Sequence, residues 1–186
     1  MADYICRFLW IVLILLPFYV VIRRPFRRRD KREGALAAFI LFTAALLTLA
    51  FEGTYQAPAA MAESMQQRLS SGEKINLIPF HTIRGFFCPF EADAFMVNIV
   101  GNIVMFMPWG FGLVFLWQKN QSPGRALLLC FVLTALIETG QLFIDRSVDV
   151  DDLILNFAGG GAGAALWAGL AKRFPMLREF ALPRLS

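Results

Sequence analysis

Acidic and amide side chains gather directly before an apolar, glycine-rich run near the C-terminal end of the sequence. The stretch IDRSVDVDDLILNFAGGGAGAALWAGL, residues 144–170, opens with aspartates and one arginine and continues as an apolar helix would. On a helix, Asp149, Asp152 and Asn156 fall at i, i+3 and i+7 and share one face, whereas Asp151 points elsewhere. Carboxylates on a shared face can bind a hard cation such as Mg²⁺ or act as general acid or base.

A second polar stripe precedes the aspartates. Glu138 and Gln141 are three residues apart, so they share a helix face, which Asp145 continues. Glu138 lies well inside an apolar run, where a carboxyl group is costly unless it is neutral, paired or in a wet cavity. Arg146 follows these residues, and we expect it to form an ion pair with a neighbouring aspartate: Asp145, Asp149 or Asp152.

Further amides and an arginine occur upstream. Asn98 and Asn102 lie four residues apart in one apolar run, and this spacing places both on one face of a helix. Asn76 and Arg84 belong to the segment INLIPFHTIRGFFCPF, residues 75–90. Together with the carboxylates, these side chains predict one polar cavity that takes a ligand with phosphate or sugar groups.

The composition places these residues in an integral membrane protein. Of the 186 residues, 58% are hydrophobic and 17% are charged, and the mean hydropathy is +0.58. These values differ from those of soluble domains, and apolar runs of about 20 residues, the length that crosses a bilayer, recur along the sequence. We therefore predict an all-α, polytopic membrane helical bundle. About five spans are expected: Tyr4–Ile22, Ala35–Phe51, Phe95–Trp117, Ala126–Ile144 and Leu153–Ala171.

Basic residues predict the orientation of the bundle. The segment Arg23–Arg32 carries seven Lys and Arg, and such clusters stay on the cytoplasmic side. The topology is then N-out and C-in, so the 52–94 connection and the acids between Asp145 and Asp152 face outward. The net charge of +4 follows from this topology and from attraction to anionic inner-leaflet lipid. It predicts no nucleic-acid partner.

The outer connection is expected to contain a short helix and an irregular apolar segment. Met61, Met65 and Leu69 recur at fourfold spacing and predict a helix with one apolar stripe. The aromatic segment after it is interrupted by prolines, and it cannot span lipid with its backbone unpaired. It therefore either lies at the membrane interface or re-enters the protein, which would bring its polar side chains to the outer mouth of the cavity.

Small residues follow the aspartates on the same predicted helix. Gly159, Gly160, Gly161 and Gly163 occur with alanines at small-xxx-small spacing, which lets a neighbouring helix approach closely. We expect the glycines to tighten the bundle and the acids to face what the bundle encloses. The alternative is that the polar side chains only bond to one another between the helices, with no ligand.

Three blocks of the sequence, in order, resemble the VanZ-like family of bacterial membrane proteins: INLIPFHTI, NIVGNIVMFMPWGFGL and ETGQLFIDRSVDVDDLILNFAGGGAGA. The resemblance covers about residues 75–168, and it is specific because linked motifs lie on the expected spans in the right order. The residues that carry it are Asn76, Pro79, Phe80, Asn102, Phe106, Pro108, Gly110, Glu138, Gln141, Arg146, Asp149, Asp152, Asn156 and Gly159.

The resemblance implies a multi-pass protein of the bacterial cell (inner) membrane. The namesake of the family is associated with resistance to the glycopeptide antibiotic teicoplanin, which implies a role in the cell envelope but no settled activity. We divide the chain into three parts. Residues 1–34 form an anchor helix and a basic cytoplasmic loop, residues 35–171 the VanZ-like membrane domain with its motif core at 75–168, and residues 172–186 a cytoplasmic tail.

An enzyme that acts on a lipid-linked phosphate or sugar is the first function that these residues fit. The arginines would hold a phosphate, since guanidinium forks match its oxygens. The residues expected to be catalytic are Glu138, Asp149 and Asp152, of which Asp149 and Asp152 would also bind a divalent cation such as Mg²⁺. The residues expected to bind substrate are Asn76, Arg84, Asn98, Asn102, Gln141, Arg146 and Asn156.

Three other functions stay open. A non-catalytic membrane protein would bind a membrane lipid, a lipid-linked envelope precursor or a lipoglycopeptide antibiotic in the same cavity. A small transporter or flippase would use Glu138 as a proton site. A hydrolytic triad of Ser147, His81 and Asp149 lacks the nucleophile-elbow signature of such enzymes. The sequence alone does not decide between an enzyme and a binding protein.

Overall fold

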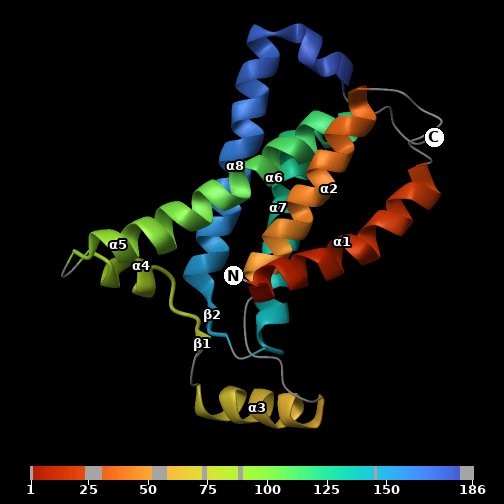
Figure 1. Cartoon of the computed structure of the whole chain (residues 1–186). Helices are drawn as coiled ribbons and strands as arrows, with labels where there is room; N and C mark the ends of the chain where they lie inside the picture. Colours follow the sequence, from red (N-terminus) through yellow and green to blue (C-terminus); the bar gives the residue numbers. More distant parts are fainter. Residues whose placement is uncertain are drawn as a thin grey trace.

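Helices make up most of the structure (Figure 1). It is a computed structural model, and it describes residues 2–23, 31–51, 58–72, 75–87, 90–144 and 146–180. Asp145 and residues 24–30 of the basic segment lie outside the described residues. The α-helices are α1 (Ala2–Arg23), α2 (Lys31–Ala50), α3 (Pro58–Ser71), α4 (His81–Gly85), α5 (Ala92–Ala94), α6 (Gly101–Leu116), α7 (Pro123–Gln141) and α8 (Val150–Arg173). The other elements are strands β1 (Ile75–Asn76) and β2 (Val148–Asp149), the π-helix Phe95–Val100 and the 3₁₀-helices Gln118–Asn120 and Pro175–Phe180.

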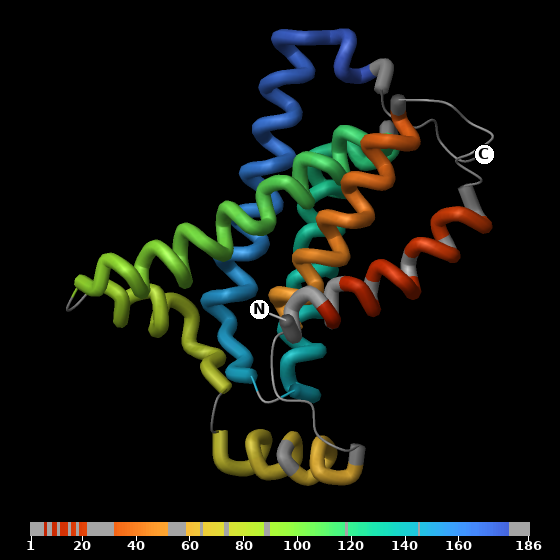
Figure 2. Tube along the Cα trace, in the orientation of Figure 1, coloured from red at the N-terminus to blue at the C-terminus, as the bar shows by residue number. Residues whose placement is uncertain are grey.

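Long apolar helices confirm the predicted membrane bundle. Within the described residues, four helices are long and apolar enough to cross a membrane: Arg32–Ala50, Ala92–Leu116, Pro123–Gln141 and Val150–Arg173. They correspond to the second to fifth predicted spans. The first predicted span lies on α1, whose apolar stretch Val12–Val21 is shorter. The helices α7 and α8 run side by side in opposite directions, and α6 crosses α8 (Figure 2).

Glycines allow α6 and α8 to cross in close contact. A Cβ atom on Gly163 would collide with the carbonyl oxygen of Met107, and a Cβ atom on Gly159 would collide with that of Ile103. The backbones of the two helices therefore touch where a side chain would normally separate them. This contact confirms that the glycine-rich run packs closely against another helix.

Gly163→Ala is expected to destabilise the protein, because the backbone of α6 would have to move away from the added methyl group. Overpacking of this kind costs about 1–3 kcal/mol and is measured as a lower melting temperature in detergent. Gly169→Ala is the matched control on the same helix, since no atom lies within 4 Å of its added Cβ. Equal melting temperatures for the two variants would contradict the close contact.

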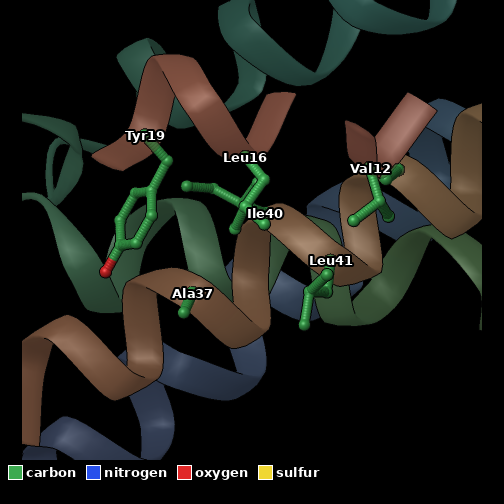
Figure 3. Close-up of a pocket in the computed structure, with 7 residues that line it drawn as sticks. Val12, Leu16, Tyr19, Ala37, Ile40 and Leu41 are labelled. Atoms are coloured by element: carbon green, nitrogen blue, oxygen red, sulfur yellow. The ribbon is translucent and has the colours of Figure 1, made fainter. Parts of the chain in front are cut away.

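Apolar side chains of α2, α6 and α7 form the main core. Leu46, Phe106 and Ile137, one from each helix, are almost completely buried in a single cluster. The helix α1 packs against α2 across a small apolar hollow of about 60 Å³ (Figure 3). At the edge of this hollow, the Tyr19 hydroxyl donates a hydrogen bond to Glu33 Oε2 at 3.2 Å. The core thus positions α6 and α7, which carry part of the polar residues described below.

The connection between α2 and α6 covers the ends of α7 and α8 (Figure 1). Its strand β1 pairs in parallel with β2, so that Ile75 lies opposite Val148 and Asn76 opposite Asp149. Phe80 has a φ of 64°, a left-handed conformation that turns the chain into α4. The irregular apolar segment therefore folds back onto the start of α8.

The predicted short helix of this connection is present as α3, but its buried face differs from the prediction. Met61 and Met65 are half-buried, as expected, whereas Leu69 is exposed. Arg68 is buried instead, because it lies three residues after Met65 and so continues the same helix face. The side of α3 that faces the bundle therefore ends in a charged group.

Candidate functional site

Asp149 is the centre of a hydrogen-bonded group at the end of the bundle where β1 and β2 pair. The amide of Asn76 donates to Asp149 Oδ1 at 2.9 Å and also to the Thr82 hydroxyl at 3.0 Å. The Thr82 hydroxyl in turn donates to Asp149 Oδ2. Asp149 is also the N-cap of α8, since its Oδ1 accepts from the backbone N–H of Asp151 at 2.8 Å. One carboxylate thus joins three segments of the chain.

Asp151 holds the turn that leads into α4. Its side chain is only 1% exposed, and its two oxygens accept hydrogen bonds from the backbone N–H groups of Phe80 and Ile83. These N–H groups belong to the turn and the first residues of α4, so the carboxylate satisfies donors that a short helix leaves unpaired. Asp151 points away from the Asp149–Asp152 face, as predicted, and positions the segment that carries Asn76 and Thr82.

The helices α6, α7 and α8 supply the remaining members of the group. Asn102 of α6 donates to Asp152 Oδ1 at 2.9 Å, and the backbone N–H of Asp149 donates to Glu138 Oε2 at 3.4 Å. Glu138 also lies within electrostatic range of Asp149 and Asp152. We call this group the outer polar cluster, because its end of the bundle is the one that the basic residues predict to face outward. Its members are Asn76, Thr82, Asn102, Glu138, Asp149 and Asp152.

Gln141 and Arg146 bind the C-terminal end of α2. The Gln141 amide donates to the carbonyl oxygen of Ala50 at 2.8 Å. The Arg146 guanidinium donates to the carbonyl oxygens of Leu49 and Ala50 at 3.2 and 3.3 Å. The last carbonyls of a helix have no partner within the helix and carry partial negative charge, so they accept these donors.

Arg146 caps α2 and is not ion-paired with either of the two predicted aspartate partners that the structure describes. Within the described residues, no ion pair joins Arg146 to Asp149 or Asp152, and Asp145 lies outside that part of the chain. Arg146 still interacts electrostatically with Glu138 and Asp152. It thus adds positive charge beside the cluster, while its guanidinium hydrogen bonds hold α2.

Two predicted substrate-binding residues lie apart from the cluster. Asn98 is exposed, and its amide donates to the Ala94 carbonyl oxygen of its own helix at 2.9 Å. Asn98 lies in the π-helical segment before α6, and Asn102, one turn further along the chain, is the asparagine that reaches α8, through Asp152. Arg84 is exposed on α4, and its side chain makes no hydrogen bond or ion pair within the described residues.

The hydrolytic triad is not assembled in the described part of the chain. His81 and Ser147 are both exposed, and neither side chain bonds to Asp149, whose oxygens accept from Asn76, Thr82 and the Asp151 amide. A nucleophile and its base must lie within hydrogen-bond reach of each other. The described geometry therefore does not bring Ser147, His81 and Asp149 together as a triad.

Three buried oxygen atoms in or beside the cluster have no hydrogen-bond partner among the described residues. They are Glu138 Oε1, Gln141 Oε1 and Asn156 Oδ1, on side chains that are 3–5% exposed. Gln141 follows Glu138 by one helical turn, and Asn156 follows Asp152 by one turn, so these oxygens extend the polar faces of α7 and α8 inward. Buried acceptors almost always have donors in folded proteins.

The cation site predicted at Asp149 and Asp152 stays a prediction. Among the described residues, no group of three or more His, Cys, Asp or Glu side chains is arranged to hold a metal ion. Both oxygens of Asp149, one of the two predicted ligands, already accept hydrogen bonds from the protein. The donor set is thus arranged for hydrogen bonding.

Sequence reasoning did not select three of the residues that build this site. Thr82 and Asp151 lie within the motif blocks but were assigned no role in the site, and Arg68 lies outside those blocks in a polar helix. The Arg68 guanidinium donates to the carbonyl oxygens of Leu142, Ile144 and Arg146 at 3.0–3.2 Å. Arg68 shares a helix face with Met61 and Met65, and this spacing could have indicated that its side chain faces the bundle.

Comparison with known proteins gives one match. No curated protein and no solved structure matches the chain. The model of the VanZ/LLP1 family matches residues 38–172, which is most of the chain and includes every residue of the outer polar cluster. The apolar helices and this match agree with a membrane protein, and the chain belongs to the VanZ-like family.

Proposed function

We propose that the outer polar cluster binds the polar head of an amphiphilic envelope molecule, either a lipid-linked sugar or a lipoglycopeptide antibiotic, at the outer leaflet of the bacterial cell membrane. The observation that carries this proposal is the set of three buried oxygens without donors, on Glu138, Gln141 and Asn156. Sugar hydroxyls and ammonium groups donate hydrogen bonds to such oxygens. The teicoplanin resistance that the family resemblance implies agrees with a ligand of this kind.

The arginines favour a sugar or amine ligand over a phosphate. The Arg146 guanidinium donates to backbone carbonyls of α2, and the Arg68 guanidinium donates to carbonyls after α7. Arg84 is exposed on α4. The cluster itself therefore presents mainly carboxylate and amide oxygens, which repel an anion and attract hydrogen-bond donors.

A second candidate function is proton-coupled transport, and Glu138 is the observation that favours it. Its carboxyl group is 5% exposed, lies in a helix long enough to cross the membrane, and has one oxygen without a partner. Ionisable groups at such positions often lie on proton or substrate pathways. A transport assay tests this candidate. Loss of transport on substitution of Glu138, with unchanged transport in Asn156→Ala, would favour it.

The binding proposal is tested with Asp152→Asn. The substitution keeps the shape and the bond from Asn102, but it removes the charge that holds an amine or a hydroxyl donor. We expect teicoplanin to raise the melting temperature of the purified wild-type protein. Asp152→Asn should reach normal membrane levels but lose both this increase and growth protection under teicoplanin stress. Asp93→Asn, which changes an exposed carboxylate before α6, is the matched control.

Asn156→Ala separates ligand binding from packing between helices. If Asn156 serves only as a polar contact, its loss lowers stability by about 0.5–2 kcal/mol and leaves protection intact. If it binds the ligand, protection falls even where expression is normal, whereas the exposed Asn98→Ala behaves as wild type. Full protection by both Asp152→Asn and Asn156→Ala would overturn the proposed function.

A further inference from the structure

A cavity lies at the end of the bundle opposite the outer polar cluster, between the end of α6, the start of α7 and the C-terminal half of α8. Its volume is about 420 Å³, within the range of small-molecule sites, about 300–1,000 Å³. We call it the inner cavity, because its end of the bundle carries Lys119, Arg125 and Lys172 and is predicted to face the cytoplasm. It shares no residue with the outer polar cluster.

Three residues that line the inner cavity each carry a buried polar atom with no hydrogen-bond partner among the described residues. Trp167 is only 3% exposed, and its indole N–H is unpaired. The amide nitrogen of Gln121 is buried and unpaired in the same way. Asn120 is also 3% exposed and has an unpaired Oδ1, because its other amide atom, Nδ2, donates to the Leu113 carbonyl oxygen. Buried groups of this kind point to an absent partner.

Most of these groups would bind an anion. The Trp167 N–H and the Gln121 NH₂ are hydrogen-bond donors, and the Lys172 ammonium group lies on a residue that lines the cavity. The helix α7 begins at Pro123 beside the cavity, and its N-cap Ser122 makes no side-chain capping bond. A helix N-terminus adds partial positive charge and free N–H groups to these donors.

The unpaired acceptor on Asn120 and the apolar lining of the inner cavity further restrict the chemical class of its ligand. Asn120 Oδ1 requires a donor, such as a hydroxyl group, next to the anion. The wall formed by α8 consists largely of small residues, among them Ala164, Ala165 and Ala168, which leave room for a hydrocarbon chain. An anion, a hydroxyl group and an acyl chain occur together in a phosphoglycerol lipid.

We infer that the inner cavity binds the headgroup of an anionic glycerophospholipid of the inner leaflet. The phosphate lies among Trp167, Gln121 and Lys172, the glycerol hydroxyl donates to Asn120 Oδ1, and an acyl chain lies along α8. The site is independent of the proposed outer ligand. Lipid bound there packs α6, α7 and α8 together at the end opposite the outer polar cluster.

The test uses the purified full-length protein in neutral detergent, with phosphatidylglycerol and phosphatidylcholine as probes. Binding is followed by native mass spectrometry and by melting temperature. Both lipids carry the phosphate, but phosphatidylcholine lacks the hydroxyl donor for Asn120 Oδ1 and places a cation near Lys172. We therefore expect phosphatidylglycerol to bind at least about tenfold more tightly than phosphatidylcholine. Glycerol 3-phosphate, which has the anion without the acyl chains, should neither stabilise the protein nor compete.

Trp167→Phe removes the indole N–H but keeps an aromatic ring, and it should weaken phosphatidylglycerol binding by about tenfold. Trp109→Phe is the matched control, because Trp109 also has an unpaired buried N–H but lies in the main core, 6.1 Å from the Phe39 ring. Lys172→Met changes an exposed side chain, so it tests the site even if Trp167→Phe folds poorly.

Several outcomes would overturn the inference. Equal binding of the two lipids would indicate a non-selective lipid surface, and stabilisation by glycerol 3-phosphate equal to that by the lipid would indicate a site for a soluble anion. Equal loss of binding in Trp167→Phe and Trp109→Phe would indicate a general packing effect. Selective binding that Lys172→Met weakens and Trp109→Phe preserves supports the inner lipid site.

Discussion

Asp151→Ala is expected to release the segment from Ile75 to Gly85 from the start of α8 and to destabilise the protein strongly. The buried carboxylate accepts hydrogen bonds from the N–H groups of Phe80 and Ile83. Hydrogen bonds to a charged group contribute about 1.5–3 kcal/mol each, so the loss of both has a large effect on the free energy of unfolding. The melting temperature in detergent measures this loss.

The matched control for this prediction is the neighbouring Asp152→Ala. Asp152 is half-buried and accepts one side-chain hydrogen bond, from Asn102, so its removal should cost less stability. Hydrogen exchange locates the difference, because the amides of Phe80 and Ile83 should exchange faster only in Asp151→Ala. Unchanged exchange at both amides would show that Asp151 does not hold this turn.

The apolar helices could be predicted from the sequence because membrane insertion depends on composition and length, which need no knowledge of contacts. The close approach of α8 to a neighbour could also be predicted, since Gly159 and Gly163 show a spacing that has few other uses. The identity of the helix that contacts α8 at these glycines could not be predicted. The structure identifies α6, whose carbonyl oxygens at Ile103 and Met107 lie against these glycines.

Helix periodicity predicted much of the candidate site. Glu138, Asp149 and Asp152 come together because each lies on the inner face of its helix or at the helix start, as the spacing indicated. Asn98 departs from the prediction because it lies one turn before Asn102, where its side chain is exposed and bonds to its own helix. The spacing of the two asparagines predicts a shared face, but it does not predict at which turn α8 first contacts that face.

The roles of the arginines depend on tertiary contacts that the sequence does not reveal. Arg146 has aspartates close to it in sequence, which favoured an ion pair, yet the end of α2 lies close in space and offers carbonyl oxygens. Arg68 is far along the chain from α7 and occurs in a polar stretch typical of solvated helices. In both cases the partner is backbone, and backbone acceptors at helix ends look alike in every sequence.

Arg68→Met should cause the second large loss of stability, because it removes three side-chain hydrogen bonds to the turn between α7 and β2. The Arg68 guanidinium donates to the carbonyl oxygens of Leu142, Ile144 and Arg146. Methionine retains an apolar stem for packing beside Met61 and Met65, so the substitution mainly removes hydrogen bonds. A buried carbonyl left without its donor costs about 1–3 kcal/mol, and the effect is measured as a lower melting temperature in detergent.

Arg84→Met is the matched control, since Arg84 lies in the same connection and is exposed without a side-chain partner among the described residues. It should leave the melting temperature close to that of the wild type. The turn that Arg68 holds leads directly into Val148 and Asp149, which pair with β1. Arg68→Met should therefore also increase hydrogen exchange at β1 and reduce teicoplanin-induced stabilisation. Equal melting temperatures for Arg68→Met and Arg84→Met would show that the Arg68 guanidinium does not support the turn. The outer polar cluster would then depend on Asp149 and Asp151 alone to hold α4 and β1 in place.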